Sequence, residues 1–568
     1  MNHLETRSED RKDGIEITPD KDELLRFWQR HHEDDKLLLP QECELQKLVY
    51  FFFVRWNQQF CSPLHKPTFV SDLAEGKVDA FLLLAMCALS ATSIAEAGPD
   101  AGEVYAENAR KLVPSRLIEP SRANVLGFLF LSMYEFCSLT SQRAWVYTGI
   151  AVRLAQLLRL SRGIPSLMSW KEQELGRRCF WAAFIFDRFL SGCESRPFII
   201  DIENINIRLP EPENDFLLEQ ASEAEYLEDW RESPSDTKSI TAWLLRLVPT
   251  WTKVTAWLSG GGRHRDPNPP WDPNSKFHSF RQELQDWCDR LPESLQFSPK
   301  NVALQSALDV GFEFYQMHII YFQALCLLHR EYLPCTTEWT VRRDGALLDL
   351  GLVSENLIKP AISSADAIFE IVQQVDLGNS LSPLSPWIGF ALFGACAVRI
   401  WENFFEDSPT TALTTSQIDY GLAILRRLSL HWHVADAWLN SLFVVHDLYA
   451  SIAFRNGKEA HLVSLPISRV PVPPPASSST YDQVRVVIRD FFANFASSQT
   501  KVEGSPVEAH FPPTALLPVP PKPDTPSNIG NMDENSYEFL DSIDSHAFFN
   551  SMVPFQEDDV LRSFENWN

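Results

Sequence analysis

One segment, from Trp170 to Pro210, joins two different patterns and so limits the possible folds strongly. Its first half repeats apolar residues every three or four positions, as one face of a helix does. After Gly192 the apolar residues become irregularly spaced, and Pro210 and Pro212 end any regular element. The sequence therefore predicts a buried helix that leads into an extended arm lying along another part of the protein. The predicted apolar face holds Leu175, Cys179, Ala182, Ala183, Phe186, Phe189 and Leu190, with Glu172, Glu174, Arg177 and Arg178 largely off it.

Charged residues in the same segment are predicted to fix the arm. Asp187 and Arg188 fall beside apolar positions, which predicts a buried or half-buried ion pair with a packing or registering role. Arg196 directly precedes Pro197, and its rigid fork of five donors is suited to hold the arm through carboxylates or backbone carbonyls. Both expected roles are structural, and neither involves catalysis.

Most of the chain between residues 41 and 463 shows helical spacing, and strand patterns are scarce. Residues 81–97 are apolar and uncharged until Glu96, which predicts a buried helix too short for a membrane span. The expected fold class is therefore all-α, a multi-helix domain. Further helices are predicted at 45–56, 121–139, 143–161, 277–291, 302–330, 362–374, 387–406 and 418–434.

The predicted helix at 143–161 has an apolar side and a basic edge. Its edge consists of Arg153 and Arg159, with Arg162 just beyond. Such an edge can contact an anion, but a solvated or salt-bridged face is the commoner role of arginines at these positions. The apolar side holds Trp145, Ile150, Leu154, Leu157 and Leu158.

The composition excludes several classes of protein. The formal charge of −25 opposes nucleic-acid binding by the chain as a whole, because phosphate contacts need a basic field. The ten cysteines come no closer in sequence than Cys326 and Cys335, so neither a disulfide framework nor a CxxC metal knuckle is expected. No signal peptide or membrane span is predicted.

The sequence contains no catalytic motif that we recognise. A nucleophile elbow, an HExxH pair, a phosphate-binding loop and a dinucleotide fingerprint are all missing from it. His318, Cys326 and His329 fall within one predicted helix, but they have no second thiol or carboxylate on the same face, so core packing is the expected role. We expect no enzyme activity and no metal or other cofactor in these residues.

The composition changes after residue 463. Residues 464–530 form a Pro- and Ser-rich linker that includes a short amphipathic helix at 481–495, which docks on the core or binds a partner. Residues 531–568 carry nine acidic side chains against one basic, a formal charge of −8, together with seven aromatics. Like charges keep such a segment expanded and its aromatics accessible, which is typical of transcriptional activation segments. A merely solubilising tail needs no aromatics. The contact residues expected are Phe539, Leu540, Phe548, Phe549, Phe555, Leu561, Phe564 and Trp567.

The string RRCFWAAFIFDRFLSGCESRPFIIDIENINIRLP, at 177–210, resembles the signature of the fungal-specific transcription factor domain, the middle homology region of fungal zinc-cluster regulators. Residues 48–69, 147–163 and 314–334 resemble that domain in the same order, so the likeness covers roughly residues 41 to 460. The resemblance implies a helical regulatory domain. The signature residues that it implies for the structure are Arg177, Arg178, Trp181, Asp187, Arg188, Arg196, Pro197 and Pro210.

The sequence departs from this family at its N-terminal end. Zinc-cluster proteins carry six cysteines that share two zinc ions beside a basic segment. Residues 1–40 form a charged segment, and the first cysteine is Cys43. Either the module has been lost, or the sequence begins downstream of it. Zinc is expected only if such a module exists.

The resemblance implies a nuclear transcriptional regulator of a fungal metabolic pathway. The genes of a secondary-metabolite cluster are one kind of target that it implies. We expect an activator or co-regulator that contacts coactivators or the transcription machinery through its tail. It would reach DNA indirectly, as a homodimer or as a heterodimer with a zinc-cluster protein. A first alternative is an N-terminally incomplete zinc-cluster activator that binds DNA itself. Another, from a different class, is a helical scaffold or ligand-binding module without a promoter role.

Overall fold

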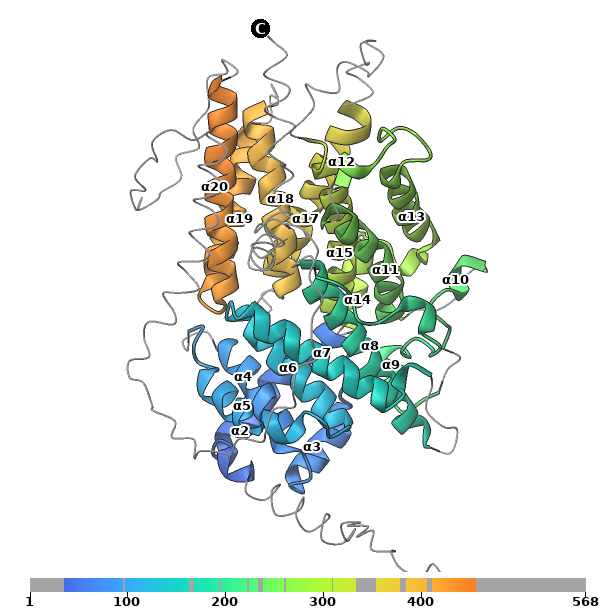
Figure 1. Cartoon of the computed structure of the whole chain (residues 1–568), viewed down its shortest axis with the longest axis vertical. Coiled ribbons are helices and arrows are strands. Elements are labelled where there is room, and N and C mark those ends of the chain that lie inside the picture. The colour runs from blue at the N-terminus through green and yellow to red at the C-terminus, as the bar shows by residue number, and fades with distance from the viewer. Residues whose placement is uncertain are drawn as a thin grey trace, which may run out of the picture.

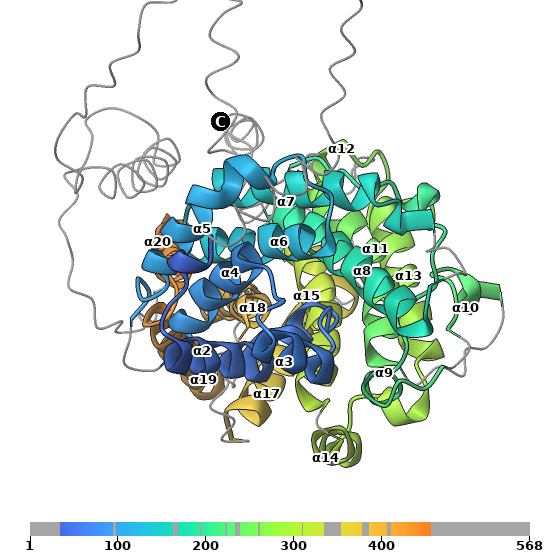
Figure 2. The same ribbon diagram turned by 90° about the horizontal axis from the view of Figure 1, so that it is seen from below.

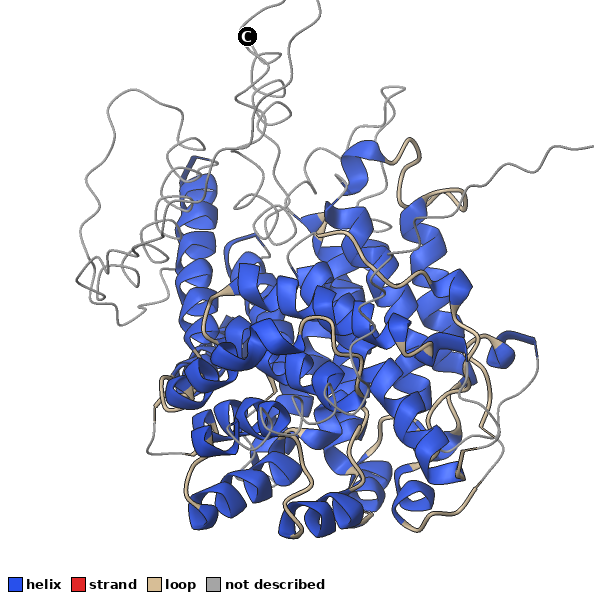
Figure 3. Ribbon diagram, turned by 60° about the horizontal axis from the view of Figure 1, so that its bottom comes forward, coloured by secondary structure: helices blue, strands red, loops and turns tan. Residues whose placement is uncertain are grey.

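The computed structural model contains helices joined by loops and turns, without a strand among the residues that it describes (Figure 3). The all-α class predicted from the sequence is confirmed. Among the described helices, none combines the length and the apolar character needed to cross a membrane. The described residues are 35–94, 98–162, 168–193, 196–221, 224–232, 239–259, 262–308, 310–333, 354–377, 385–405 and 411–455.

The N-terminal helices form the lower part of the molecule in Figure 1. Helix α4 lies at their centre, and all of its residues are buried. The Asp79 side chain starts α4 by accepting hydrogen bonds from the backbone amides of Phe81 (2.8 Å) and Leu82 (3.3 Å). The buried helix predicted at 81–97 is present, but it ends at Thr92. The helices of this part are α2 (Glu42–Arg55), α3 (Lys66–Ala74), α4 (Ala80–Thr92), α5 (Glu103–Arg116), α6 (Arg122–Cys137) and α7 (Ser141–Leu157), with short 3-10 turns at Lys36–Leu38, Asn57–Phe60 and Leu160–Arg162.

The middle of the chain contains the long helix α8 and the helices that pack beside it. The helix predicted at 302–330 is wrong as one continuous element, because one helix ends at Ala307 and the next begins at Gly311. The amide of Val310 donates to the carbonyl of Gln305 (3.1 Å), and a Cβ on Gly311 would lie 3.2 Å from the Cα of Ser306. The tight turn therefore suits glycine. The helices are α8 (Trp170–Cys193), α9 (Glu213–Leu217), α10 (Asp229–Glu232), α11 (Ile240–Ser259), α12 (Gly262–Arg265), α13 (Lys276–Arg290), α14 (Pro299–Ala307) and α15 (Gly311–Arg330), with 3-10 turns at Ile202–Asn204 and Glu293–Leu295.

The C-terminal helices pack against both other parts, so the core is continuous from Leu45 to Tyr449. The ring of Trp432 lies 6.0 Å from that of Trp56, the residue that follows α2. Nearby, Nδ1 of His431 lies 2.7 Å from the carbonyl oxygen of Thr92. Residues more than 300 positions apart therefore share one core. The helices of this part are α17 (Lys359–Leu377), preceded by one π-helical turn at Ser354–Ile358, α18 (Pro386–Phe405), α19 (Thr411–Ser429) and α20 (His433–Arg455).

Candidate functional site

Helix α8 crosses the middle of the molecule and packs against α6, α7 and α11 (Figures 1 and 2). Its buried surface is wider than the single face predicted from the sequence, because neighbouring helices cover it on several sides. Arg178, expected largely off the apolar face, is fully buried. Near its C-terminal end α8 approaches α11 closely, since a Cβ on Gly192 would lie 2.7 Å from the ring of Trp251.

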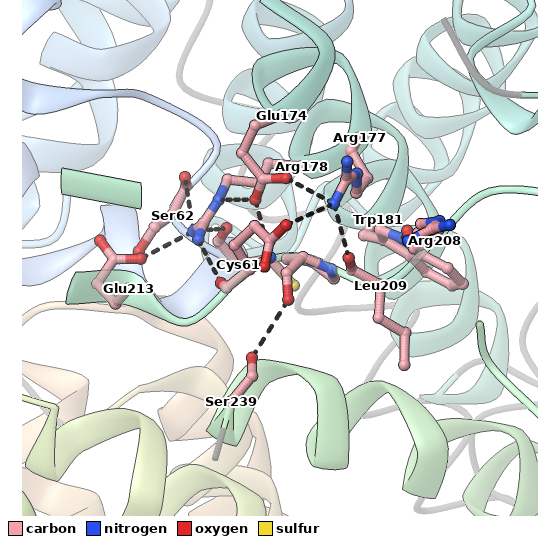
Figure 4. A network of polar contacts seen from close by, with 12 residues as sticks. Cys61, Ser62, Glu174, Arg177, Arg178, Trp181, Arg208, Leu209, Glu213 and Ser239 are labelled. Carbon is pink, nitrogen blue, oxygen red and sulfur yellow. Dashed lines mark hydrogen bonds and ion pairs between the residues drawn. The ribbon is translucent and has the colours of Figure 1, made fainter. Parts of the chain in front are cut away.

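Arg178 is the centre of a buried polar network that joins three segments (Figure 4). Its Nε donates to Glu174 one turn earlier (2.7 Å), and one terminal nitrogen donates to Glu213 (2.8 Å). The guanidinium also donates to the carbonyls of Cys61 (3.1 Å) and Glu211 (2.7 Å). Burial alone would lower the pKa of Arg178, but the carboxylates of Glu213 and Glu174 more than offset that effect, so the group stays charged. Its cation therefore holds α8, the 61–62 turn and the 211–213 segment together.

The far end of the arm is held by two further residues of α8. The indole Nε1 of Trp181 donates to the carbonyl of Arg208 (2.8 Å), and Arg177 donates to the carbonyl of Leu209 (3.3 Å). The carbonyl of Pro210 accepts from the hydroxyl of Ser239 (3.3 Å), just before α11 (Figure 4). The arm is thus fixed between α8 and α11 by contacts to its backbone. Proline has no N–H to donate, but its carbonyl can still accept a hydrogen bond.

The near end of the arm is bound by Asp187. Its fully buried carboxylate accepts hydrogen bonds from the backbone amides of Ile199 (3.0 Å) and Ile200 (3.0 Å). Burial raises the pKa of Asp187, while the two amides and the guanidinium of Arg188 oppose that rise. The predicted pairing of Asp187 with Arg188 is the weaker contact, with 3.9 Å between its nearest nitrogen and oxygen. Asp187 binds the arm chiefly through backbone amides, which side-chain patterns do not reveal.

Arg188 and Arg196 contact aromatic rings. The Arg188 guanidinium donates to the carbonyl of Ile200 and lies over the rings of Phe184 (4.9 Å) and Phe198 (4.7 Å). The Arg196 guanidinium lies 4.9 Å above the ring of Trp145 on α7. This indole is a partner in addition to the carboxylates or carbonyls predicted for Arg196. The Pro197 that follows is exposed.

An apolar groove of about 340 Å³ opens on the surface where the arm meets α7 and the end of α5. Its exposed residues include Ile118 (83% exposed) and Leu157 (63%), and Arg153 lies at its edge. Leu157, on the apolar side predicted for this helix, is exposed, because no described element covers it there. The groove is lined by Leu117, Ile118, Val146, Gly149, Ile150, Arg153, Leu154, Leu157 and Ile199.

His318 and His329, which were considered as metal ligands, lie in the core. Nε2 of His318 donates to the carbonyl of Leu295 (2.9 Å), and the ring packs against Phe314 with 4.6 Å between centroids. His329 packs edge-on against Phe277. Within the described ranges, no three His, Cys, Asp or Glu side chains gather closely enough to hold a metal ion.

Acidification should destabilise the protein through His318. Burial lowers its pKa to about 4, although the hydrogen bond to Leu295 opposes that shift. The unfolded ring titrates near 6.5, so below that pH the unfolded state binds a proton that the native state excludes, and stability falls as pH falls toward 4. Between pH 7 and 4.5 the loss should reach about 2–3 kcal/mol. In His318→Gln this contribution disappears, and urea unfolding followed by tryptophan fluorescence should show a correspondingly smaller loss. Equal losses in both proteins would contradict the assignment.

Comparison with known proteins finds a family match in the middle of the chain. Residues 49–289, which include α8 and the arm, match the fungal specific transcription factor domain. The Zn(2)-C6 fungal-type transcription factor FTF1c of Fusarium oxysporum f. sp. lycopersici is 27% identical over 424 residues, which cover 69% of this chain and 44% of that protein. FTF2 of the same fungus is 26% identical over 456 residues, covering 75% of this chain and 41% of the relative.

A third relative comes from another organism. An uncharacterised transcriptional regulatory protein of Schizosaccharomyces pombe is 26% identical over 467 residues, which cover 73% of this chain and 65% of that protein. The chain spans less than half the length of the Fusarium relatives that it matches. Residues 49–289 therefore resemble the fungal specific transcription factor domain, and the chain is similar to transcriptional regulators over most of its length.

Proposed function

We propose that the protein is a nuclear transcriptional regulator of a fungal metabolic pathway, in which the helical domain is regulatory and residues 531–568 activate transcription. The observation that carries this proposal is the match of residues 49–289 to the fungal specific transcription factor domain. The relatives named as transcription factors or transcriptional regulators support it.

The helical domain suits a regulatory role because its signature residues bind other parts of the protein. Arg178, Asp187 and Trp181 all hold the arm and its neighbours through internal hydrogen bonds. Such a junction provides a rigid platform on which other surfaces of the domain can bind partners. In our proposal the domain forms a homodimer or a heterodimer with a zinc-cluster protein.

DNA contact is the second part of the proposal. The relatives FTF1c and FTF2 are named Zn(2)-C6 factors, whereas the 568 residues contain no closely spaced cysteine pair. We propose that a zinc-cluster partner supplies the DNA contact. The other route is a zinc cluster encoded upstream of Met1, and the 5′ end of the native transcript distinguishes the two. An in-frame six-cysteine module there would replace the partner in this scheme.

The tail lies outside the described residues, and its role rests on its acidic-aromatic composition. Residues 531–568 fused to a heterologous DNA-binding domain should activate a reporter. Substituting Phe548, Phe549, Phe564 and Trp567 by alanine should abolish the signal, because apolar contacts with coactivator grooves supply most of the affinity. The matched control replaces Ser536, Ser542, Ser545 and Ser551 by alanine and should leave the signal unchanged. A silent parent fusion, expressed at the level of the control, would refute activation by this segment.

A further inference from the structure

The apolar groove between the end of α5, α7 and the arm lacks a cover among the described residues. Ile118, Val146 and Leu157 are its most exposed side chains, and Arg153 is the single charged residue among those that line it. Contiguous apolar surface of this kind marks a binding site on a soluble domain. The volume of about 340 Å³ suits a few large side chains rather than a whole domain face. The groove therefore suits a short segment with several large apolar residues.

The first described residues of the chain run along α5 toward this groove. The side chain of Asn108, in the middle of α5, donates to the carbonyl of Leu38 (3.1 Å). Three residues earlier in the chain, the carboxylate of Asp35 lies 2.7 Å from a guanidinium nitrogen of Arg116, the last residue of α5. Traced toward the N-terminus, the chain thus passes from the middle of α5 to its C-terminal end. The two residues that follow Arg116 line the groove.

The contact at Arg116 holds the chain firmly at this point. Arg116 is almost completely buried, and its guanidinium also lies 3.3 Å from a carboxylate oxygen of Asp79 and 2.9 Å from one of Glu119. The side chain of Asp35 is itself only 14% exposed. A shielded charge pair with several partners is held far more strongly than an exposed one. Residue 35 is therefore fixed near the groove, and the residues before it start from there.

The residues before Asp35 lie outside the described part of the chain, and their sequence predicts an amphipathic helix. Thr18 followed by Pro19 is typical of the start of a helix. Residues 20–32 would form a helix about 20 Å long, and the part of α7 that lines the groove, 146–157, is about as long. The apolar side that helical spacing predicts holds Leu24, Leu25, Phe27 and Trp28, with His31 and His32 at its end, and the opposite side holds Asp22, Arg26, Gln29 and Glu33.

We propose that residues 20–32 dock in this groove as an amphipathic helix of the same chain, with Leu24 and Trp28 inserted beside α7. Two residues separate this helix from the anchored Asp35, and such a short tether gives an effective concentration on the order of millimolar. The docked helix covers the exposed apolar side chains of the groove. It also fixes the point at which the chain before residue 20 leaves the helical domain. This docking is independent of whether the protein regulates transcription.

Photocrosslinking of the full chain tests this docking. With p-benzoylphenylalanine in place of Trp28, illumination should link that position to residues 117–118 or 146–157, as mapped by mass spectrometry. The linked product should be a monomer, with a yield independent of protein concentration. The same crosslinker in place of Arg26, on the opposite side of the predicted helix, should form far fewer of these links.

Two results would overturn the proposal. One is a set of links from position 28 that reaches only other parts of the domain. The other is a link between two chains whose yield increases with protein concentration, because the groove would then bind this segment of a second copy. Equal groove links from positions 26 and 28 would contradict the predicted apolar side in the same way.

Carboxylates placed in the groove provide a test from the other side of the contact. Ile118→Asp with Leu157→Asp should lower the yield of groove links from position 28 by about fivefold, because docking would take both charges out of water. Both side chains are exposed, so the domain should fold normally. The matched control is Leu430→Asp, at an exposed leucine between α19 and α20, which should leave the yield unchanged. An unchanged yield in the groove variant would refute the groove as the binding site.

Discussion

Arg178→Met should lower the free energy of unfolding by about 3–5 kcal/mol, or prevent folding altogether. Removing the guanidinium leaves the carboxylates of Glu174 and Glu213 without the cation between them, and Glu174 is fully buried. The carbonyls of Cys61 and Glu211 also lose their donor. Urea denaturation followed by tryptophan fluorescence measures the loss.

Two further variants keep this prediction testable if Arg178→Met does not fold. Arg178→Lys keeps the charge but offers one ammonium in place of the planar fork, so it should fold with an intermediate loss. Glu213→Gln should cost less in the Arg178→Lys background than in the parent, with about 0.5–2 kcal/mol of coupling.

The control for Arg178 is an ion pair on the surface. Arg122 binds Glu172 at 2.6 Å, and both side chains are partly exposed. Arg122→Met should cost no more than about 1 kcal/mol, because exposed pairs contribute little. If it costs as much as Arg178→Met, the special role of the buried network is wrong.

Asp187→Ala should release the near end of the arm and cost about 2–4 kcal/mol. The substitution leaves the amides of Ile199 and Ile200 without an acceptor in a buried environment, and each such loss costs about 1–3 kcal/mol. Hydrogen exchange at these two amides should accelerate more than exchange in the middle of α8, because the opening is local.

Asp187→Asn is the matched variant. Its amide oxygen still accepts a hydrogen bond, so the loss should be nearer about 1 kcal/mol. Similar losses for alanine and asparagine would show that the hydrogen bonds to the arm are not what Asp187 contributes.

The helical elements were predictable because burial leaves a periodic trace in the sequence. Helix α4 is a clear example, since a run of apolar residues this long can only be covered on every side. The break between Ala307 and Gly311 was not predictable in the same way. Apolar residues continue through it at helical intervals, and the close approach of the chain at Gly311 to Ser306 has no counterpart in the hydrophobic pattern.

The buried polar contacts of Arg178 and Asp187 were only partly predictable. A hydrophobicity pattern predicts that Arg178 is exposed to solvent. In the structure Arg178 is completely buried, and its hydrogen-bond acceptors include residues 61, 211 and 213. Asp187 was expected to be buried, but its principal partners are backbone amides. Nearly every residue type has such an amide, so the sequence does not show which one will be the partner. Leu157 shows the reverse error, because an apolar residue looks the same whether or not another element covers it.

The contact between His431 and Thr92 also bears on protein synthesis, because 339 positions separate the two residues. A ribosome adds about 5–20 residues per second, so His431 is made about 20–70 s after Thr92. During that interval the surface of the first helices that later meets Trp432 has no native covering. Chaperones that bind nascent chains would therefore act on this protein chiefly through its N-terminal helices, until the C-terminal ones emerge to take their place.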